Sequence, residues 1–222
     1  MIMSAHQPAY LPWLGYFDKI RRSDIFIFLD TVQYEKNSFT NRNKIKSQNG
    51  PIWLSIPVIK TDHFDKIMSE MPINNQSHWK RKHLNSIQMS YSKAPRFKEL
   101  FPKIQDLYSK DHENIVDVTW DHLMFWLDVL NIHTKIIKSS SLDVVSKKSD
   151  FVFDLCNVVD ADHYISGAMG KDYLEIEKFE NAGITVEFQN YKHPVYKQLF
   201  GEFIPNMGIV DFAMNADDYN IF

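Results

Sequence analysis

The chain has 222 residues, of which 44% are hydrophobic and 14% aromatic, so it can bury a substantial core and is not a disordered chain. Its formal net charge of -3 excludes the general attraction to nucleic acid or to an anionic membrane that a basic protein has. The single cysteine, Cys156, excludes a disulfide framework, and its apolar surroundings favour a buried thiol over a nucleophile.

The first elements predict a strand, a stiff loop, a helix and a second strand. Apolar residues over 2–5 form the strand, after which Pro8, Pro12 and Gly15 delay a regular helix. We expect that helix over 15–22. The near-continuous apolar segment 24–30 is typical of a strand that is buried on both faces of a parallel sheet, so these elements make one βαβ unit.

The next stretch predicts a β-hairpin and then a helical insertion. The turn signal over 47–50 separates two expected strands, 43–46 and 52–58. Residues 76–130 have a helical pattern that Pro95 and Pro102 are expected to break. The last of these helices has one apolar stripe: Ile115, Val118, Leu123, Trp126, Leu127 and Leu130.

Strands and helices alternate in the rest of the chain. The predicted elements are a strand over 132–138, a helix over 149–159, a strand over 163–166, a helix over 171–181 and a strand over 184–188. This alternation predicts an α/β fold with a mostly parallel, Rossmann-like sheet. We expect one domain over 1–222, with the helical insertion over about 76–130 and an irregular C-terminal segment over about 191–222.

No apolar run approaches the about 20 residues that span a bilayer. Polar Ser4, His6 and Gln7 stand where a signal peptide would have its apolar stretch. We therefore expect a cytoplasmic protein without a membrane span, in the reducing compartment that a lone cysteine also favours.

Polar residues that follow the strands are candidates for a site, because ligands of parallel sheets bind beyond the carboxyl ends of the strands. The first cluster is His6, Gln7, Tyr10 and Trp13, on a loop stiffened by prolines. We predict that His6 is catalytic in proton transfer and that Gln7, Tyr10 and Trp13 bind substrate. The alternative is a histidine that only bonds to the backbone.

A second cluster, Asp30, Gln33 and Tyr34, ends the second strand. We predict that Asp30 is catalytic, since a carboxylate there can hold a sugar hydroxyl or a metal, and that Gln33 binds substrate. An aspartate that merely caps a turn is about equally expected.

The third cluster includes Asn41, Arg42 and Lys44. Arg42 and Lys44 point to the same side of an extended strand and can pair with phosphate or carboxylate. Solvated charges that protect a sheet edge are the alternative.

A fourth cluster follows the strand over 163–166. Ser166 and Gly167 lead into Lys171 and Tyr173, and small residues there let backbone amides approach an anion. The Walker A spacing is absent, so a simple turn is the alternative.

The sequence predicts no metal site, since the five-residue spacing of His78 and His83 does not place both on one helix face. No G-x-S-x-G elbow or credible Cys–His pair favours covalent hydrolysis.

The segment from Ser4 to Tyr16 resembles the N-terminal signature of the WbqC-like family. Later blocks resemble it too, over nearly the whole chain: Asp30–Tyr34, Asn41–Lys46, Trp53–Val58, Ser166-Gly167 with Asp172–Leu174, and Tyr196–Pro205. The resemblance implies a role in O-antigen or other surface-polysaccharide biosynthesis, the gene clusters in which the family is chiefly known. One departure is Gly208 before Ile-x-Asp, where family members tend to have serine.

A second resemblance concerns architecture. The opening strand, loop, helix and strand are similar to those of nucleotidyltransferase-like proteins such as pantothenate synthetase, whose H-x-G-H loop binds ATP phosphates. At the corresponding position this chain has Trp13-Leu14-Gly15-Tyr16, which lacks both histidines of the H-x-G-H loop. A shared fold would imply that phosphate handling has changed or passed to His6 and Lys171.

These resemblances lead to three functional hypotheses. The first is a transferase that adds an acyl or aminoacyl group to an amino sugar on a nucleotide carrier, with Tyr10, Trp13, Tyr16 and Trp53 stacking on base or sugar. Arg42 and Lys44 would hold the diphosphate, and His6 would take the amine proton. The second is an ATP-dependent adenylating or nucleotidyl-transfer enzyme that uses Mg²⁺. A non-catalytic nucleotide-sugar binding module is the third; the sequence itself requires no cofactor.

Overall fold

The computed structural model describes residues 1–35, 38–59 and 66–222. The contacts divide the chain into two compact units. Unit 1 comprises Met1–Gln7, Gly15–Val32 and Ile132–Lys192, and unit 2 comprises Pro8–Leu14, Gln33–Asn131 and His193–Phe222. Each unit is therefore assembled from three separate stretches of the chain. The N-terminal segment from Ser4 to Tyr16 contributes residues to both units.

Unit 1 contains a five-stranded sheet in the order β5-β2-β1-β6-β7, in which every neighbouring pair is parallel. The strands are β1 (Ile2–His6), β2 (Ile25–Phe28), β5 (Lys135–Lys138), β6 (His163–Ser166) and β7 (Thr185–Phe188). All four residues of β2 are buried, as its continuous apolar run predicted. The prediction of a mostly parallel α/β fold is confirmed.

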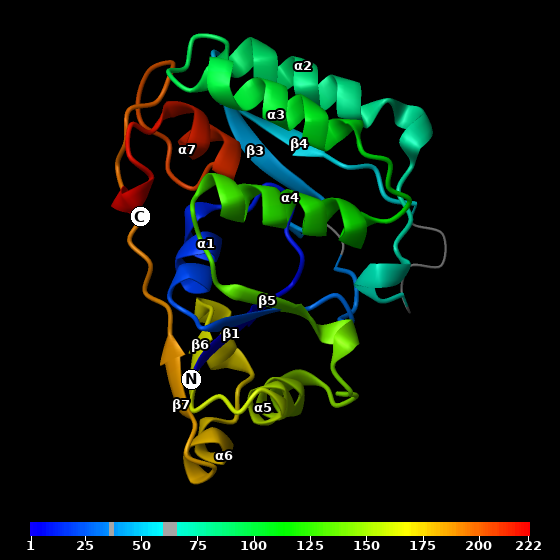
Figure 1. The fold of residues 1–222 in the computed structure, drawn as a ribbon, viewed down its shortest axis with the longest axis vertical. Coiled ribbons are helices and arrows are strands. Elements are labelled where there is room, and N and C mark those ends of the chain that lie inside the picture. Colours follow the sequence, from blue (N-terminus) through cyan, green and yellow to red (C-terminus); the bar gives the residue numbers. More distant parts are fainter. Residues whose placement is uncertain (36–37, 60–65) are drawn as a thin grey trace. The chain divides into compact units, whose positions relative to one another are not determined.

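Helices lie on both faces of this sheet (Figure 1). The apolar cluster on one face joins Met3 and Ala5 of β1 to α5 (Lys148–Val158) and α6 (Ile176–Asn181). Because side chains alternate along a strand, Ser4 and His6 point to the opposite face, where α1 (Leu14–Arg21) lies.

The single helix predicted over 171–181 is wrong in its first half. The structure has a 3₁₀ turn, η5 (Ala168–Asp172), before α6 begins at Ile176. Gly167 and Gly170 disfavour a regular helix, and the Gly170 amide instead donates to the Gly167 carbonyl at 3.0 Å. Another 3₁₀ turn of unit 1, η4 (Ser139–Ser141), follows β5.

Unit 2 contains the predicted hairpin, which is confirmed. Strands β3 (Arg42–Ser47) and β4 (Gly50–Ser55) pair antiparallel, and Gly50 has a φ of 99°, which a tight turn requires and glycine adopts without strain. Ile45 and Leu54 are buried. In register, Lys44 lies opposite Trp53.

The helices of unit 2 are α2 (Trp79–Tyr91), α3 (Phe97–Ser109), α4 (Ile115–Val129) and α7 (Ile209–Asn215). Short 3₁₀ turns complete it: η2 (Met68–Glu70), η3 (Asn75–Ser77) and η6 (Tyr219–Ile221). The predicted stripe of α4 is buried. The prediction that Pro102 breaks a helix is wrong, since it lies within α3. The proline removes one backbone hydrogen bond, whereas α3 buries Leu100, Phe101, Ile104, Leu107 and Tyr108.

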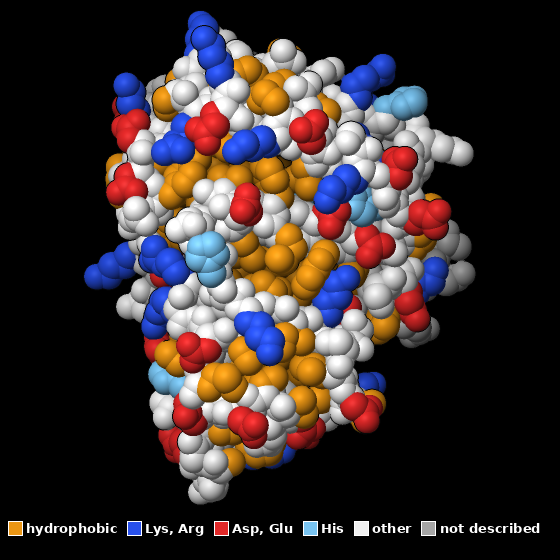
Figure 2. All heavy atoms as spheres, in the orientation of Figure 1, with side chains coloured by type: hydrophobic (Ala, Val, Ile, Leu, Met, Phe, Trp, Pro, Cys, Tyr) orange, Lys and Arg blue, Asp and Glu red, His pale blue; other side chains and the backbone are white. Residues whose placement is uncertain are grey.

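In the part of the chain that the structure describes, no helix combines the length and apolar character that crossing a membrane requires. On the face drawn in Figure 2, basic and acidic side chains are interspersed with apolar ones rather than gathered into one basic region.

Candidate functional site

The strand order of unit 1 reverses between β1 and β6. Strands β2 and β5 lie on one side of β1, and β6 and β7 lie on the other. In open parallel sheets, ligands bind at such a switch point, beyond the carboxyl ends of the two strands. His6 ends β1 there and Gln7 follows it, and continuing the register from Ser4↔Ile165 places His6 across from Gly167. A Cβ added to Gly167 would meet nothing within 4 Å, so this position has open space beside it.

His6 is held in one orientation at this point. Its Nδ1 lies 3.0 Å from the Gln7 carbonyl oxygen, and because a carbonyl only accepts, Nδ1 carries the proton and Nε2 the lone pair. The imidazole makes an edge contact with the Tyr16 ring at 4.9 Å, and Tyr16 Oη donates to the same carbonyl at 3.3 Å. Burial, with the nearby charge of Lys19, lowers the pKa of His6 to about 3, so this histidine is neutral at physiological pH.

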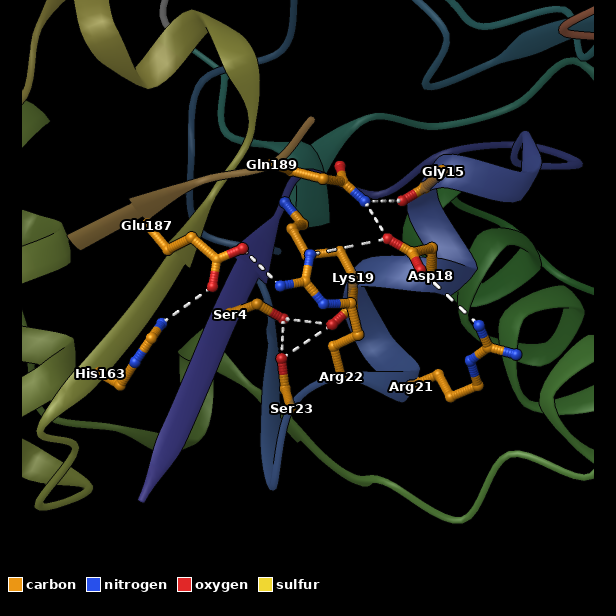
Figure 3. Close-up of polar contacts among 10 residues, drawn as sticks. All are labelled: Ser4, Gly15, Asp18, Lys19, Arg21, Arg22, Ser23, His163, Glu187 and Gln189. Carbon is orange, nitrogen blue, oxygen red and sulfur yellow. Dashed lines mark hydrogen bonds and ion pairs between the residues drawn. The ribbon is translucent and has the colours of Figure 1, made fainter. Parts of the chain in front are cut away.

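Lys19 is a buried amine on α1. Its side chain is only 2% exposed, and Nζ donates to the Ala5 carbonyl of β1 at 2.8 Å. The Ser23 hydroxyl lies 2.7 Å from Ser4 Oγ and 2.8 Å from the Lys19 carbonyl oxygen, where α1 crosses the strand (Figure 3). Burial lowers the pKa of Lys19 to about 7.

Sequence reasoning missed Lys19, although a signal was present. Lys19 follows Tyr16 by three residues, and this spacing places both on the same face of a helix. Since the Tyr16 ring contacts Phe26 of the sheet, the lysine faces the sheet as well.

Gln189, which follows β7, joins that strand to the start of α1. Its Nε2 donates to the Gly15 carbonyl and to Asp18 Oδ2, each at 2.8 Å (Figure 3). Asp18 also forms ion pairs with Arg21 and Arg22. Lys19 forms no ion pair with any residue that the structure describes.

Asp30 caps a turn. Its Oδ1 accepts from Ser139 Oγ at 2.8 Å and from the Ser140 amide at 2.9 Å, and its Oδ2 accepts from Ser140 Oγ at 2.6 Å. These bonds fix the start of η4. Since β1 lies between β2 and β6, Asp30 is not beside Ser166 in the sheet.

Ser166 lies on the other face from His6. Continuing the β1–β6 register pairs it with Ala5, so its hydroxyl points to the side of α5 and α6. A Cβ on Gly170 would overlap Ser166 Oγ, which explains why a glycine stands there. Further along, Lys171 Nζ lies 5.4 Å from the ring centroid of Phe188, and Tyr173 is exposed.

Tyr10 belongs to a buried polar cluster of unit 2. Its Oη lies 2.8 Å from His83 Nδ1 and is hydrogen-bonded to Tyr108, and its ring centroid lies 5.2 Å from that of His122. Burial lowers the pKa of His83 to about 4 and that of His122 to about 3, and it raises the pKa values of both tyrosines. The predicted ligand-binding phenol is thus fully buried in this cluster.

Two predicted polar residues of unit 2 have backbone partners. Asn41 Nδ2 donates to the Ile56 carbonyl at 2.7 Å, and Gln33 forms an isolated antiparallel bridge with Ile67. These contacts connect the hairpin and its flanking segments.

The remaining predicted residues of unit 2 gather around an exposed tryptophan. Arg42 Cζ lies 4.5 Å and Lys44 Nζ 4.8 Å from the ring centroid of Trp53. Phe39, which sequence reasoning missed, lies between two tryptophans. Its ring centroid is 6.0 Å from that of Trp53 and 5.6 Å from that of Trp13. We call these five residues the Trp53 patch.

Asp211 is the centre of a second buried network of unit 2. Its carboxylate accepts from Tyr91 Oη at 2.8 Å, Tyr196 Oη at 2.7 Å and Gln198 Nε2 at 2.7 Å. The network joins the Tyr196–Gln198 block to Asp211 of the Ile-x-Asp block.

Gly208 approaches two backbone segments closely. Its amide donates to the Lys44 carbonyl at 2.8 Å, and a Cβ would lie 2.8 Å from the Leu11 carbonyl oxygen. A residue with a Cβ therefore does not fit at this position without a shift of the neighbouring backbone.

Together these features define an α/β protein with a parallel sheet and a polar group of residues at its switch point. The chain belongs to the WbqC-like protein family, whose profile matches residues 7–221. It is 31% identical over 219 residues to "Uncharacterized protein Rv1507c" of Mycobacterium tuberculosis, covering 96% of this chain and 94% of that protein. No solved structure matches the chain. Over residues 1–35, 38–59 and 66–222, no group of three or more His, Cys, Asp or Glu side chains is arranged to hold a metal ion.

Proposed function

We propose that this protein is a transferase of cell-surface polysaccharide biosynthesis, which adds an acyl or aminoacyl group to an amino sugar carried on a nucleotide. The observation that carries the proposal is the position of His6 and Gln7 at the switch point of the sheet, across from the open space at Gly167. The resemblance to surface-polysaccharide proteins supplies the pathway.

The chemistry needs a group that orients an amine and a group that accepts its proton. In acyl transfer, the sugar nitrogen forms a bond to the carbonyl carbon, the bond from that carbon to the donor's leaving group breaks, and the nitrogen loses a proton. His6 Nε2 carries a lone pair and is suited to accept a hydrogen bond from the amine.

The proton itself is better assigned to Lys19. A histidine with a pKa of about 3 is a weak base, whereas a lysine with a pKa of about 7 exchanges its proton near physiological pH. In the proposed reaction, His6 orients the nucleophile and Lys19 takes up the released proton. This assignment modifies the sequence-based hypothesis, in which His6 takes the amine proton.

A transfer assay tests the proposal. The protein is incubated with UDP- and dTDP-linked amino sugars and, in separate reactions, with acyl-CoA, aminoacyl-tRNA, or ATP plus a carboxylic acid. Mass spectrometry is expected to show one nucleotide sugar that gains the mass of the acyl group. The His6→Asn variant, in which Asn Nδ2 can replace the bond to the Gln7 carbonyl but nothing replaces Nε2, is expected to reduce turnover at least tenfold.

The matched control is His163→Asn. His163 begins β6, at the opposite end of the same sheet, and its Nε2 pairs with Glu187 at 3.2 Å. Turnover of this variant should equal that of the wild type. Pyrophosphate release from ATP without transfer would indicate an adenylating enzyme instead, and nucleotide-sugar binding without turnover under any condition would indicate a binding module.

A further inference from the structure

Gln189 shares one row and one face of the sheet of unit 1 with His6. The register of β6 and β7 pairs Ser166 with Phe188. The ladder continues beyond this pair, because the Gln189 amide donates to the Ser166 carbonyl at 2.9 Å, and this bond places Gln189 across from Gly167. Gly167 has an extended backbone, with a φ of -67° and a ψ of 163°, so strand alternation still holds there. His6 and Gln189 therefore flank Gly167 from its two sides, and both side chains point to the face on which α1 lies.

The side-chain amide of Gln189 has one possible orientation. Its Nε2 donates to the Gly15 carbonyl and to Asp18 Oδ2. A carbonyl and a carboxylate only accept, so the nitrogen must face α1 and Oε1 must point the other way, as Figure 3 shows. Over the ranges that the structure describes, no group donates a hydrogen bond to this oxygen. Oε1 of the half-buried Gln189 is thus an acceptor that the two bonds of Nε2 hold in place.

The position between His6 and Gln189 is open. A Cβ on Gly167 would meet no described atom within 4 Å. Neighbouring strands lie about 4.8 Å apart, so the backbones of the two flanking residues are roughly 10 Å apart across this position. That width suits one six-membered sugar ring between the two side chains. Gln189 Oε1 and the lone pair of His6 Nε2 match the hydroxyl and amine donors of such a ring and repel the oxygens of a phosphate.

We propose that Gln189 is a substrate-binding residue of the His6 site, and that its Oε1 accepts a hydrogen bond from a hydroxyl group of the amino sugar. The inference deepens the proposed function and rests on it for the identity of the sugar. It assigns the sugar ring, rather than the phosphates of the nucleotide carrier, to the space at Gly167. A site built to bond a hydroxyl group discriminates against an analogue that lacks it, because the acceptor is then left without a partner.

Calorimetric titration of UDP- and dTDP-linked amino sugars and their monodeoxy analogues tests the inference. Gln189→Lys is the informative variant, because an ammonium group can still donate to Gly15 and Asp18 but offers no acceptor. We expect the wild type to bind one amino sugar at least tenfold more tightly than the matching deoxy analogue. Gln189→Lys should bind both with the weaker affinity, a loss of selectivity that a merely structural role of Gln189 would not produce. Circular dichroism establishes that the variant has folded.

A second variant tests the position of the sugar. Gly167→Leu fills the open space on a backbone that any residue adopts, so the protein should fold and its affinity for the amino sugar should fall at least tenfold. Ala182→Leu adds the same bulk at an exposed residue after α6 and should bind as the wild type does. UDP alone that loses as much affinity in Gly167→Leu as the amino sugar does would place a phosphate there and overturn the inference.

The outcomes separate this inference from the proposed function. Equal affinity of the wild type for the amino sugar and every monodeoxy analogue, or unchanged selectivity in Gln189→Lys, overturns the role of Gln189 and leaves the transferase standing. Selective binding that Gln189→Lys abolishes, without transfer from any acyl donor, supports the role of Gln189 and contradicts the transferase. Failure of every nucleotide-linked amino sugar to bind the wild type overturns both.

Discussion

Lys19 shows how one residue connects the fold to the proposed chemistry. The amine is buried under β1, and its one hydrogen-bond acceptor among the described residues is the Ala5 carbonyl. Burying an ammonium group without an acidic partner costs free energy, which the protein reduces by holding the pKa near 7. Proteins retain groups that reduce stability at positions where function needs them, and the proposed role of Lys19 is such a function.

Lys19→Met is therefore expected to stabilise the protein and to impair transfer. Methionine fills a similar volume without a charge, so the free energy of unfolding at pH 7 should increase by roughly 1 kcal/mol or more. Chemical denaturation measures this change, and turnover should fall at least tenfold. Lys135→Met, at an exposed lysine that begins β5 in unit 1, is the control and should change neither quantity.

The pH dependence gives a second readout for the same residue. The pKa of Lys19 is about 7 in the folded chain, whereas a solvated lysine of the unfolded chain has the ordinary value of 10.5. Between these two pH values the unfolded chain therefore holds a proton that the folded chain lacks. Lys19 therefore contributes a rise in stability from about pH 7 to 10.5. Lys19→Met should remove that rise, and an unchanged slope would contradict the burial of a titrating amine.

At the scale of elements, the sequence predicted best where one local pattern decides the structure. The apolar run of β2 and the turn signal of the hairpin each led to the observed element. Pro102 was misread because tertiary packing of α3 outweighs the one hydrogen bond that proline removes. The start of α6 was misread because two glycines change a helical turn into a 3₁₀ turn, which periodicity does not reveal.

Gly208 provides a test of packing between elements of unit 2. The Gly208→Ser substitution places a Cβ 2.8 Å from the Leu11 carbonyl oxygen and 3.1 Å from that of Lys44. We expect a loss of about 1–3 kcal/mol in the free energy of unfolding, measured with urea. Gly167→Ser, where a Cβ meets nothing within 4 Å, should lose much less; equal losses would contradict the close approach at Gly208.

At the scale of the whole molecule, the sequence could place polar residues at strand ends but not decide their surroundings. The block from His6 to Tyr16 is continuous in sequence, yet Gln7 belongs to unit 1 and Tyr10 to unit 2. Strand alternation separates Ser166 from His6, and this depends on a register that no local pattern reveals. Phe39 became visible only through its neighbours in space, Trp13 and Trp53.

Buried neutral histidines predict how the whole molecule responds to acid. His6, His83 and His122 have folded pKa values of about 3, 4 and 3, below the ordinary 6.5. As the pH falls below 6.5, the unfolded chain binds protons that the folded chain cannot, so stability decreases toward pH 4. Urea unfolding between pH 7.5 and 4.5 should show this decrease, and His122→Phe should weaken it. A flat profile would contradict the burial of these rings.

The central claim is that His6 at the switch point contacts a nucleotide-linked amino sugar, and calorimetric titration of that ligand tests it most directly. A UDP-linked amino sugar is titrated into the wild type, His6→Asn and His163→Asn. We expect at least tenfold weaker binding for His6→Asn and unchanged binding for His163→Asn. Equal affinity in all three proteins, or no binding by the wild type to any nucleotide-linked amino sugar, would contradict it.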